Sequence, residues 1–275
     1  MKEYADLHVH TIYSDGSKTP EEVVQMAEQA GLAAISITDH DNLEGCIQAQ
    51  ELKHNYSIEI IDGVEFSCFD NGREYHVMGY NIDPDNKHLR DHLSYFRDAR
   101  LKRAEIILEK LKSINISIDF DSVLEKAGEA PIARPHIASA LLDEGYISTL
   151  KEAFNLYLGE GKPAYQAKAM FTVEKAIKLI NNSGGVSSLA HPAKTVTQDT
   201  LYKFIKLGLD GIEVVHPMHD DSLTNYYSSI ARQYWLLETG GSDYHGTRDY
   251  DETNFGKFVV PATAVESIKL ACGRH

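Results

Sequence analysis

The 275-residue sequence has few cysteines and no long apolar run. Its three cysteines, Cys46, Cys68 and Cys272, are widely separated, which argues against a disulfide framework or a thiolate zinc site and predicts free thiols. No segment is long and apolar enough to span a bilayer, and the first residues lack the apolar core of a signal peptide. We therefore expect a cytoplasmic protein that does not contact a membrane.

Positive charge is also scarce. There are 27 lysines and arginines against 41 aspartates and glutamates, which gives a formal net charge of −14. Proteins that bind long duplex nucleic acid usually present a basic face to the phosphates, so this balance argues against such a partner. A small phosphorylated substrate such as a nucleotide remains compatible with it, and bound cations would offset part of the negative charge. Composition does not fix the oligomeric state.

The first part of the chain alternates strands and helices. Strands are predicted at residues 4–9, 33–38 and 58–61, with helices after Thr19-Pro20 and over residues 42–54. Thr19 and Glu22 form a capping-box pattern around a proline at the first helical position, and Gly31 is expected to end this helix. Asp70-Asn71-Gly72 predicts a hairpin turn between strands at 64–69 and 74–80.

The hydrophobic period becomes helical between residues 83 and 165, and strand–helix alternation returns after Thr172. Later strands are expected at residues 185–189, 211–215 and 235–238. We therefore predict an α/β fold with a discontinuous barrel domain, residues 1–82 and 166–275. Residues 83–165 are expected to form an inserted small helical domain that caps the substrate.

Histidines and carboxylates recur at or near the ends of the predicted strands. His8 and His10 are two residues apart on a strand, so both imidazoles project to the same side. The carboxyl ends of strands converge in barrels of alternating strands and helices, which would bring distant ligands together. The candidate metal ligands are His8, His10, Asp15, His40, Glu65, His76, His191, Asp243 and His245.

Such a mixed set of imidazoles and carboxylates suits zinc, manganese or iron, and its size implies at least two cations. A carboxylate such as Glu65 can bridge two of them. Neighbouring cations can hold a bridging hydroxide, polarise a phosphoryl oxygen and stabilise the leaving oxygen. Hydrolysis of a phosphoester is therefore the expected reaction.

The motifs that contain these residues strongly resemble those of the PHP (polymerase and histidinol phosphatase) family. The resemblance implies a distorted (β/α)7 barrel with a trinuclear site, in which the three divalent ions are commonly Mn2+, with Zn2+, Fe2+ or Mg2+ in some relatives. The matching motifs are His8-Val9-His10, Ser14-Asp15-Gly16, Thr38-Asp39-His40, Gly63-Val64-Glu65, His76-Val77-Met78-Gly79, Ala190-His191-Pro192 and Gly241-Ser242-Asp243-Tyr244-His245-Gly246.

The resemblance also implies a division of the ligands. One metal would take His8, His10, Glu65 and Asp243. A second would share Glu65 and add His76 and His191, and a third would take Asp15, His40 and His245. A hydroxide between metals would attack phosphorus, and Asp15, His40 and His191 are the expected catalytic residues among the ligands.

Within the family, the inserted segment resembles the nucleotide phosphatase branch. That branch removes the 3′-phosphate of nucleoside 3′,5′-bisphosphates, and related enzymes trim short RNA from its 5′ end. Arg100 and Arg103 on a predicted helix, with Arg134 and His136 at the start of another, are the candidate substrate-binding residues because guanidinium groups bind phosphate oxygens through a fork of donors. A solvated helix face with local ion pairs is the alternative for Arg97, Arg100 and Arg103.

The sequence is also compatible with other functions. A histidinol-phosphate phosphatase, or another small-molecule phosphatase, would use the same ligands. A non-catalytic PHP module typically lacks some of them, whereas all are present here, and an amidohydrolase with a similar barrel is a more distant alternative. His216 and His219 follow a predicted strand, and the sequence does not assign them a role.

Overall fold

The computed structural model describes residues 3–272, in two compact units. One unit contains the chain up to Arg90 and from Phe171 onward, and the other is Asp91–Met170. Each unit has hydrophobic clusters of its own. Among residues 3–272, no helix combines the length and apolarity of a membrane span.

The first unit is built on one eight-stranded sheet with the order β7-β6-β5-β4-β3-β2-β1-β8. Strands β1 to β3 are parallel to one another, as are β5 to β7, whereas β4 is antiparallel to both of its neighbours. The strands are β1 (Tyr4–Val9), β2 (Ala34–Ile37), β3 (Glu59–Asp70), β4 (Arg73–Tyr80), β5 (Val186–Leu189), β6 (Gly211–Val215), β7 (Leu237–Gly240) and β8 (Val260–Pro261).

The sheet curls into a nearly closed barrel, as expected for the distorted α/β barrel. The segment after β7 returns to β1, where the amide of Asp243 donates to the carbonyl of His8 and the amide of His10 donates to the carbonyl of Tyr244, both at 2.9 Å. Gly241 allows this approach, because a Cβ atom at that position would lie 2.4 Å from the backbone nitrogen of His8. Closure therefore brings the segment after β7 against β1.

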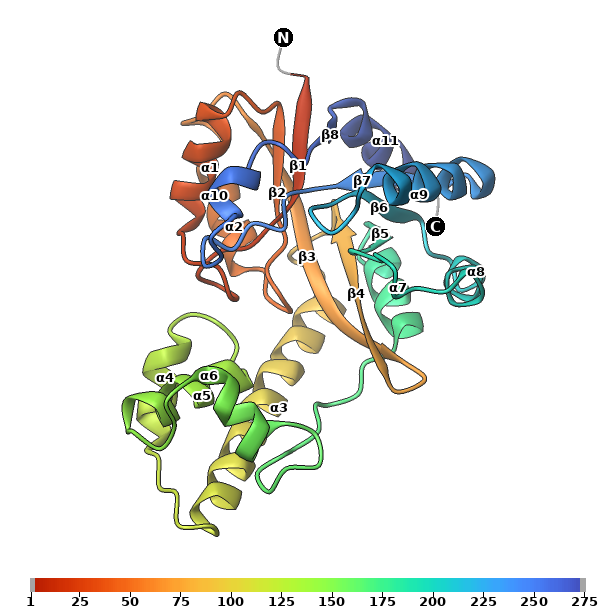
Figure 1. Cartoon of the computed structure of the whole chain (residues 1–275). Coiled ribbons are helices and arrows are strands. Elements are labelled where there is room, and N and C mark those ends of the chain that lie inside the picture. Colours follow the sequence, from red (N-terminus) through yellow and green to blue (C-terminus); the bar gives the residue numbers. More distant parts are fainter. Residues whose placement is uncertain (1–2, 273–275) are drawn as a thin grey trace. The chain divides into compact units, whose positions relative to one another are not determined.

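Helices cover the outside of the barrel (Figure 1). Thr19 caps the first of them as predicted, because its side chain accepts from the amide of Glu22 while the Glu22 carboxylate accepts from the amide of Thr19. The helices of this unit are α1 (Pro20–Gln29), α2 (Glu44–Glu51), α7 (Val173–Asn182), α8 (Gln198–Lys206), α9 (Asp221–Tyr234), α10 (Asp251–Asn254) and α11 (Thr263–Ala271).

Several details of the predicted elements are corrected. The segments expected as separate strands at 58–61 and 64–69 are one continuous strand, β3. The hairpin turn between β3 and β4 is confirmed, with Asn71 and Gly72 both at positive φ. The prediction that the last strand begins at Trp235 is wrong, because α9 continues to Tyr234. Trp235 is the C-cap of α9, has a left-handed backbone conformation and is exposed to solvent. The short strand β8 was not predicted.

The second unit is helical. Its helices are α3 (Lys87–Lys112, which begins in the first unit), α4 (Phe120–Ala127), α5 (Arg134–Asp143), α6 (Leu150–Ala153) and the π-helical turn η1 (Phe154–Leu158). They enclose an apolar cluster that includes Ile107, Leu111, Val123 and Leu141. This burial explains the helical hydrophobic period of the segment.

Candidate metal centre

All nine predicted ligands lie in the barrel unit and face one another across its interior. His8 is on β1, and His10 follows it at once. Glu65 and His76 lie in the interior of β3 and β4, so the expectation that every ligand lies at a strand end is wrong for these two. Their positions still favour contact, because His76 is paired with Ser67, two residues from Glu65 and on the same face of the sheet.

The first donor group contains two imidazole nitrogens and two carboxylate oxygens. His8 Nε2 lies 3.2 Å from His10 Nε2, and each of these nitrogens lies 3.3 to 3.4 Å from Glu65 Oε2 and Asp243 Oδ1. His8, His10 and Glu65 are fully buried. These are the four residues that the family resemblance assigns to one metal.

The second group uses the other oxygen of Glu65. Glu65 Oε1 lies 3.0 Å from both His76 Nδ1 and His191 Nε2, and these two nitrogens are 3.1 Å apart. Because one oxygen belongs to each group, the Glu65 carboxylate is placed to bridge two cations.

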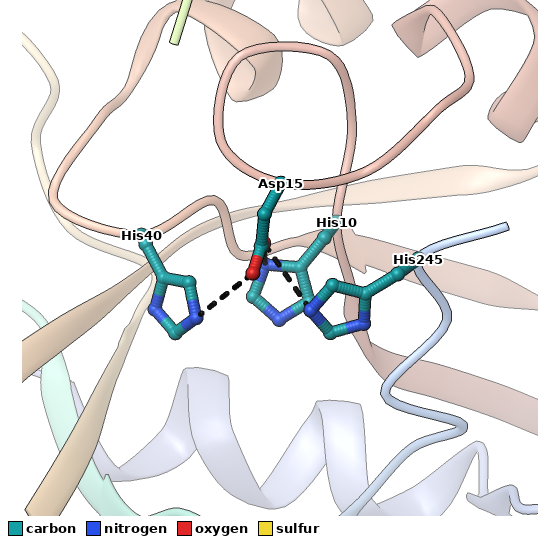
Figure 2. Close-up of side chains that lie close together, drawn as sticks. All are labelled: His10, Asp15, His40 and His245. Carbon is teal, nitrogen blue, oxygen red and sulfur yellow. Dashed lines mark ion pairs between the residues drawn. The ribbon is translucent and has the colours of Figure 1, made fainter. Parts of the chain in front are cut away.

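The third group surrounds the carboxylate of Asp15, which enters from the loop after β1 (Figure 2). His245 Nε2 lies 3.2 Å from Asp15 Oδ1, and His40 Nε2 lies 3.9 Å from Asp15 Oδ2. His10 also lies beside Asp15, with its ring stacked on that of His245 at a centroid distance of 4.2 Å. His40 presents its other nitrogen, Nδ1, to Glu65 Oε2 at 3.0 Å and so lies between the groups.

The geometry of these donors fits divalent cations. Ligands about 2.0 to 2.2 Å from an ion would be separated by about 2.8 to 3.6 Å in octahedral or tetrahedral arrangements, which covers the distances in the first two groups. Glu65 Oε2 and His40 Nδ1 are buried and lie 3.0 Å apart, but neither makes a hydrogen bond of acceptable geometry with the other or with any other residue in the described part of the chain. Such atoms are costly to bury unless something satisfies them. A cation would satisfy both, so the residues present fit a multinuclear metal site.

Electrostatics favour the same conclusion. Burial opposes protonation of His8, but the carboxylates of Glu213, Glu65 and Asp243 outweigh it and raise its pKa well above the ordinary value. Burial also opposes the charge on His10, yet bonds to Asp243 and Glu65 raise its pKa to about 10. Burial lowers the pKa of His40 to about 3, which keeps this imidazole neutral. The carboxylates therefore create a field that attracts positive charge, whether protons or metal ions.

Outer hydrogen bonds orient several of the donors. The amide and hydroxyl of Thr11 and the hydroxyl of Ser14 donate to the buried Asp39 carboxylate at 2.5 to 2.7 Å, and Ser14 Oγ lies 3.3 Å from His10 Nδ1. His245 Nδ1 lies 2.8 Å from the carbonyl of Asp243, which leaves its Nε2 directed at Asp15. Such contacts fix the tautomer and the ring orientation of a metal-binding histidine.

Two residues at the centre were not among the site residues predicted from the sequence. Glu213 is a fully buried carboxylate on β6 that contacts His8 and His191. Its position inside a short apolar strand was a usable signal, because a buried charge requires partners. Arg248 lies in the loop after β7, where its guanidinium nitrogens are 3.1 Å from Asp243 Oδ2 and 3.5 Å from His245 Nε2. Nothing in the sequence pattern indicated Arg248.

His216 and His219, to which the sequence assigned no role, differ in their contacts. His219 is structural, because its Nε2 accepts from the amide of Ala193 and its Nδ1 lies 2.9 Å from the carbonyl of Val214. His216 is buried beside the first donor group, with Nε2 3.5 Å from Asp243 Oδ2, and that nitrogen makes no hydrogen bond with any of residues 3–272.

The predicted substrate-binding residues are in the helical unit. Arg103 is buried and its Nε donates to the carbonyl of Gln166 at 2.8 Å. The Arg134 guanidinium lies over the rings of Phe154 and Tyr165, with centroid distances of 5.6 and 5.8 Å, and donates to a carbonyl of η1. His136 accepts from the amide of Ala133 at the start of α5, and Arg100 is half-buried on α3.

Comparison with known proteins agrees with the motifs. The PHP domain family matches residues 6–157, which is more than half of the chain. The chain belongs to the PHP family. It is 32% identical over 250 residues to the 5′-3′ exoribonuclease Rnm of Salmonella typhimurium, covering 87% of this chain and 84% of the relative. It is 31% identical over 258 residues to the 3′,5′-nucleoside bisphosphate phosphatase of Chromobacterium violaceum, covering 90% of each chain.

A similar solved structure extends the PHP likeness to the whole fold. The crystal structure of a Bifidobacterium adolescentis protein assigned as a metal-dependent phosphoesterase has a TM-score of 0.83 and 30% sequence identity, covering 97% of this chain and 95% of that one. The protein is thus a PHP-family metal-dependent phosphoesterase, and the two relatives named above are hydrolases.

Proposed function

We propose that this PHP enzyme hydrolyses phosphomonoesters at the barrel centre, and that its preferred substrates are nucleoside 3′,5′-bisphosphates, from which it removes the 3′-phosphate. The metal ligands are the nine residues of the three donor groups, and Mn2+ is the proposed ion. The proposal rests on one observation: the two oxygens of the Glu65 carboxylate belong to different donor groups.

Two or more cations held on either side of Glu65 would polarise a phosphoryl oxygen and make a water acidic enough to attack phosphorus. The side chains divide by exposure. The side chains of His8, His10 and Glu65 are fully buried. Those of Asp15, His40 and His191 are 52%, 22% and 26% exposed. A bound substrate can reach these three ligands and also His76, which is 22% exposed; this accessibility supports the assignment of Asp15, His40 and His191 as catalytic residues.

Arg248 adds a positive group beside the same centre. Its guanidinium is 37% exposed while it contacts the Asp243 carboxylate, so it keeps donors available to solvent. A guanidinium that is already held in place loses little freedom when it binds a phosphoryl oxygen. We propose that Arg248 contacts the phosphate that is cleaved.

The helical unit supplies the proposed site for the second phosphate. Three cations, two from α3 and one from α5, contact the same short stretch of this unit: Arg134 lies against the Tyr165 ring, Lys110 donates to the Tyr165 carbonyl, and Arg103 donates to the Gln166 carbonyl. Guanidinium groups with fixed orientation suit a phosphate dianion. We propose that Arg134, with Arg100, Arg103 and His136, binds the 5′-phosphate and that residues 83–165 act as the substrate-capping insertion.

The substrate is tested directly. Purified protein loaded with Mn2+ is assayed for phosphate release from 3′-phosphoadenosine 5′-phosphate and histidinol phosphate, and for release of nucleoside 5′-monophosphates from a short 5′-phosphorylated oligoribonucleotide. We expect the highest kcat/KM for the bisphosphate. Higher kcat/KM for histidinol phosphate would contradict the nucleotide assignment, and preference for the oligoribonucleotide would assign 5′-end trimming of RNA instead.

The role of the second phosphate is tested by comparing two substrates. If Arg134 binds the 5′-phosphate, Arg134→Ala raises KM for the bisphosphate by about 10- to 100-fold, the value of one lost hydrogen bond to a charged group, and leaves KM for adenosine 3′-monophosphate unchanged. Arg232→Ala, which removes a mostly exposed arginine of α9, is the matched control. Equal KM changes for both substrates would refute this role.

A further inference from the structure

Glu213 occupies an unusual place for a carboxylate. It lies in the middle of β6, between Ile212 and Val214, and is fully buried. Its two oxygens have different partners: Oε1 lies 2.9 Å from His8 Nδ1, and Oε2 accepts from the backbone amide of His191 at 2.6 Å. One buried carboxylate thus contacts ligands of two different donor groups.

The contact with His8 determines which ring nitrogen carries the proton. An ionised carboxylate can only accept, so Nδ1 of His8 must be the donor. In the neutral ring, Nε2 therefore directs its lone pair at the space shared with His10 Nε2, Glu65 Oε2 and Asp243 Oδ1. This is the tautomer that a metal ligand requires.

The contact with His191 holds an unfavourable backbone. His191 has a φ of +26° and Ala193 a φ of +45°, a region that residues with side chains rarely adopt. The short bond from the His191 amide to Glu213 Oε2 stabilises this conformation, which turns the His191 ring toward Glu65 Oε1. Tyr227 and His219 bind the carbonyl and the amide of Ala193 and support the same turn.

We propose that Glu213 is a positioning residue that sets the His8 tautomer and the His191 backbone together, and so couples the two cation sites that share Glu65. The inference rests on the metal centre proposed above. It differs from a ligand role, because both Glu213 oxygens are engaged by hydrogen-bond donors.

Glu213→Gln tests the coupling with little change of shape. An amide has one acceptor and one donor end, so it cannot accept from His8 and His191 at once. If its oxygen stays with the His191 amide, its NH2 group faces His8 Nδ1 and moves the His8 proton to Nε2, where it blocks a metal ligand. The reverse orientation leaves the His191 amide without an acceptor.

The measurement is Mn2+ bound per protein by mass spectrometry after equilibration at graded free Mn2+, with folding checked by circular dichroism. We expect Glu213→Gln to weaken binding of Mn2+ by about 10- to 100-fold. Glu238→Gln is the matched control, since Glu238 lies on the adjacent strand β7 and contacts Ser228 and Arg232 of α9. We expect the control to bind as the wild type does.

The outcomes separate this inference from the proposed function. A wild type that binds no Mn2+ refutes the metal centre itself. A wild type that binds Mn2+ together with an unchanged Glu213→Gln variant refutes only the positioning role. Glu213→Asp retains the charge but is one methylene shorter, so it also loses simultaneous contact and should also weaken binding. Failure of both variants to fold would overturn the inference by making Glu213 a residue of general stability.

Discussion

The loop that follows β7 depends on one buried carboxylate. Asp251 Oδ2 accepts from three backbone amides, those of His245, Thr247 and Arg248, at 3.1 to 3.3 Å. This oxygen therefore fixes the backbone that carries both a proposed ligand and the guanidinium beside it. Asp251→Asn retains the shape and one oxygen but removes the charge, so it tests how much that anchor contributes.

The magnitude follows from the three bonds. A hydrogen bond to a charged acceptor contributes about 1.5 to 3 kcal/mol and a neutral one about 0.5 to 1.5, so each bond loses about 1 kcal/mol. Because all three share one oxygen, we expect the free energy of unfolding of the barrel unit to fall by about 2 kcal/mol. For a unit of this size, that corresponds to a melting temperature lower by about 4 to 8 °C.

The assay combines thermal unfolding with Mn2+ binding. We expect the Asp251→Asn variant to lose affinity first at the Asp15–His245 group, because His245 is held by this loop. Asp249→Asn, an exposed aspartate of the same loop, is the control and should match the wild type in both measurements. If Asp251→Asn melts and binds Mn2+ as the wild type does, the loop does not depend on this carboxylate. Equal losses in Asp249→Asn would point to a general effect of charge.

Further predictions concern the metals, two ligands and the thiols. Dialysis against a chelator should abolish phosphate release and added Mn2+ should restore it; activity that survives chelation would contradict a metal-dependent reaction. His191→Ala and Asp243→Ala should each abolish turnover while circular dichroism stays native, so a variant with substantial turnover would remove that residue from the proposed metal ligands. Burial raises the pKa of the Cys46 and Cys68 thiols, which keeps them protonated and unreactive as pH rises to 8. Iodoacetamide should therefore label Cys272 first in native protein, and equal labelling of all three thiols would contradict their burial.

Much of the fold could be predicted from local patterns. The capping box at Thr19, the Asn71-Gly72 hairpin and the helical period of residues 83–165 each depend on interactions between near neighbours, which a sequence displays directly. The start of the last strand could not be predicted in this way. Trp235 has high strand propensity, but α9 extends to its neighbour and the chain turns there in a left-handed conformation.

The family, the α/β class and the nine candidate ligands can be predicted from the amino-acid sequence alone, because each motif is a short run of residues whose chemistry and spacing need no knowledge of the fold. Which of these residues contact one another, and which further residues join them, depends on the tertiary structure. Strands β1 and β6 are far apart in the order of the sheet, yet its curvature places His8 2.9 Å from Glu213. Closure of the barrel likewise brings Asp243 to His8, and with it Arg248 to the centre. These contacts depend on how far the whole sheet curls, which is set by packing throughout the barrel and not by any local pattern.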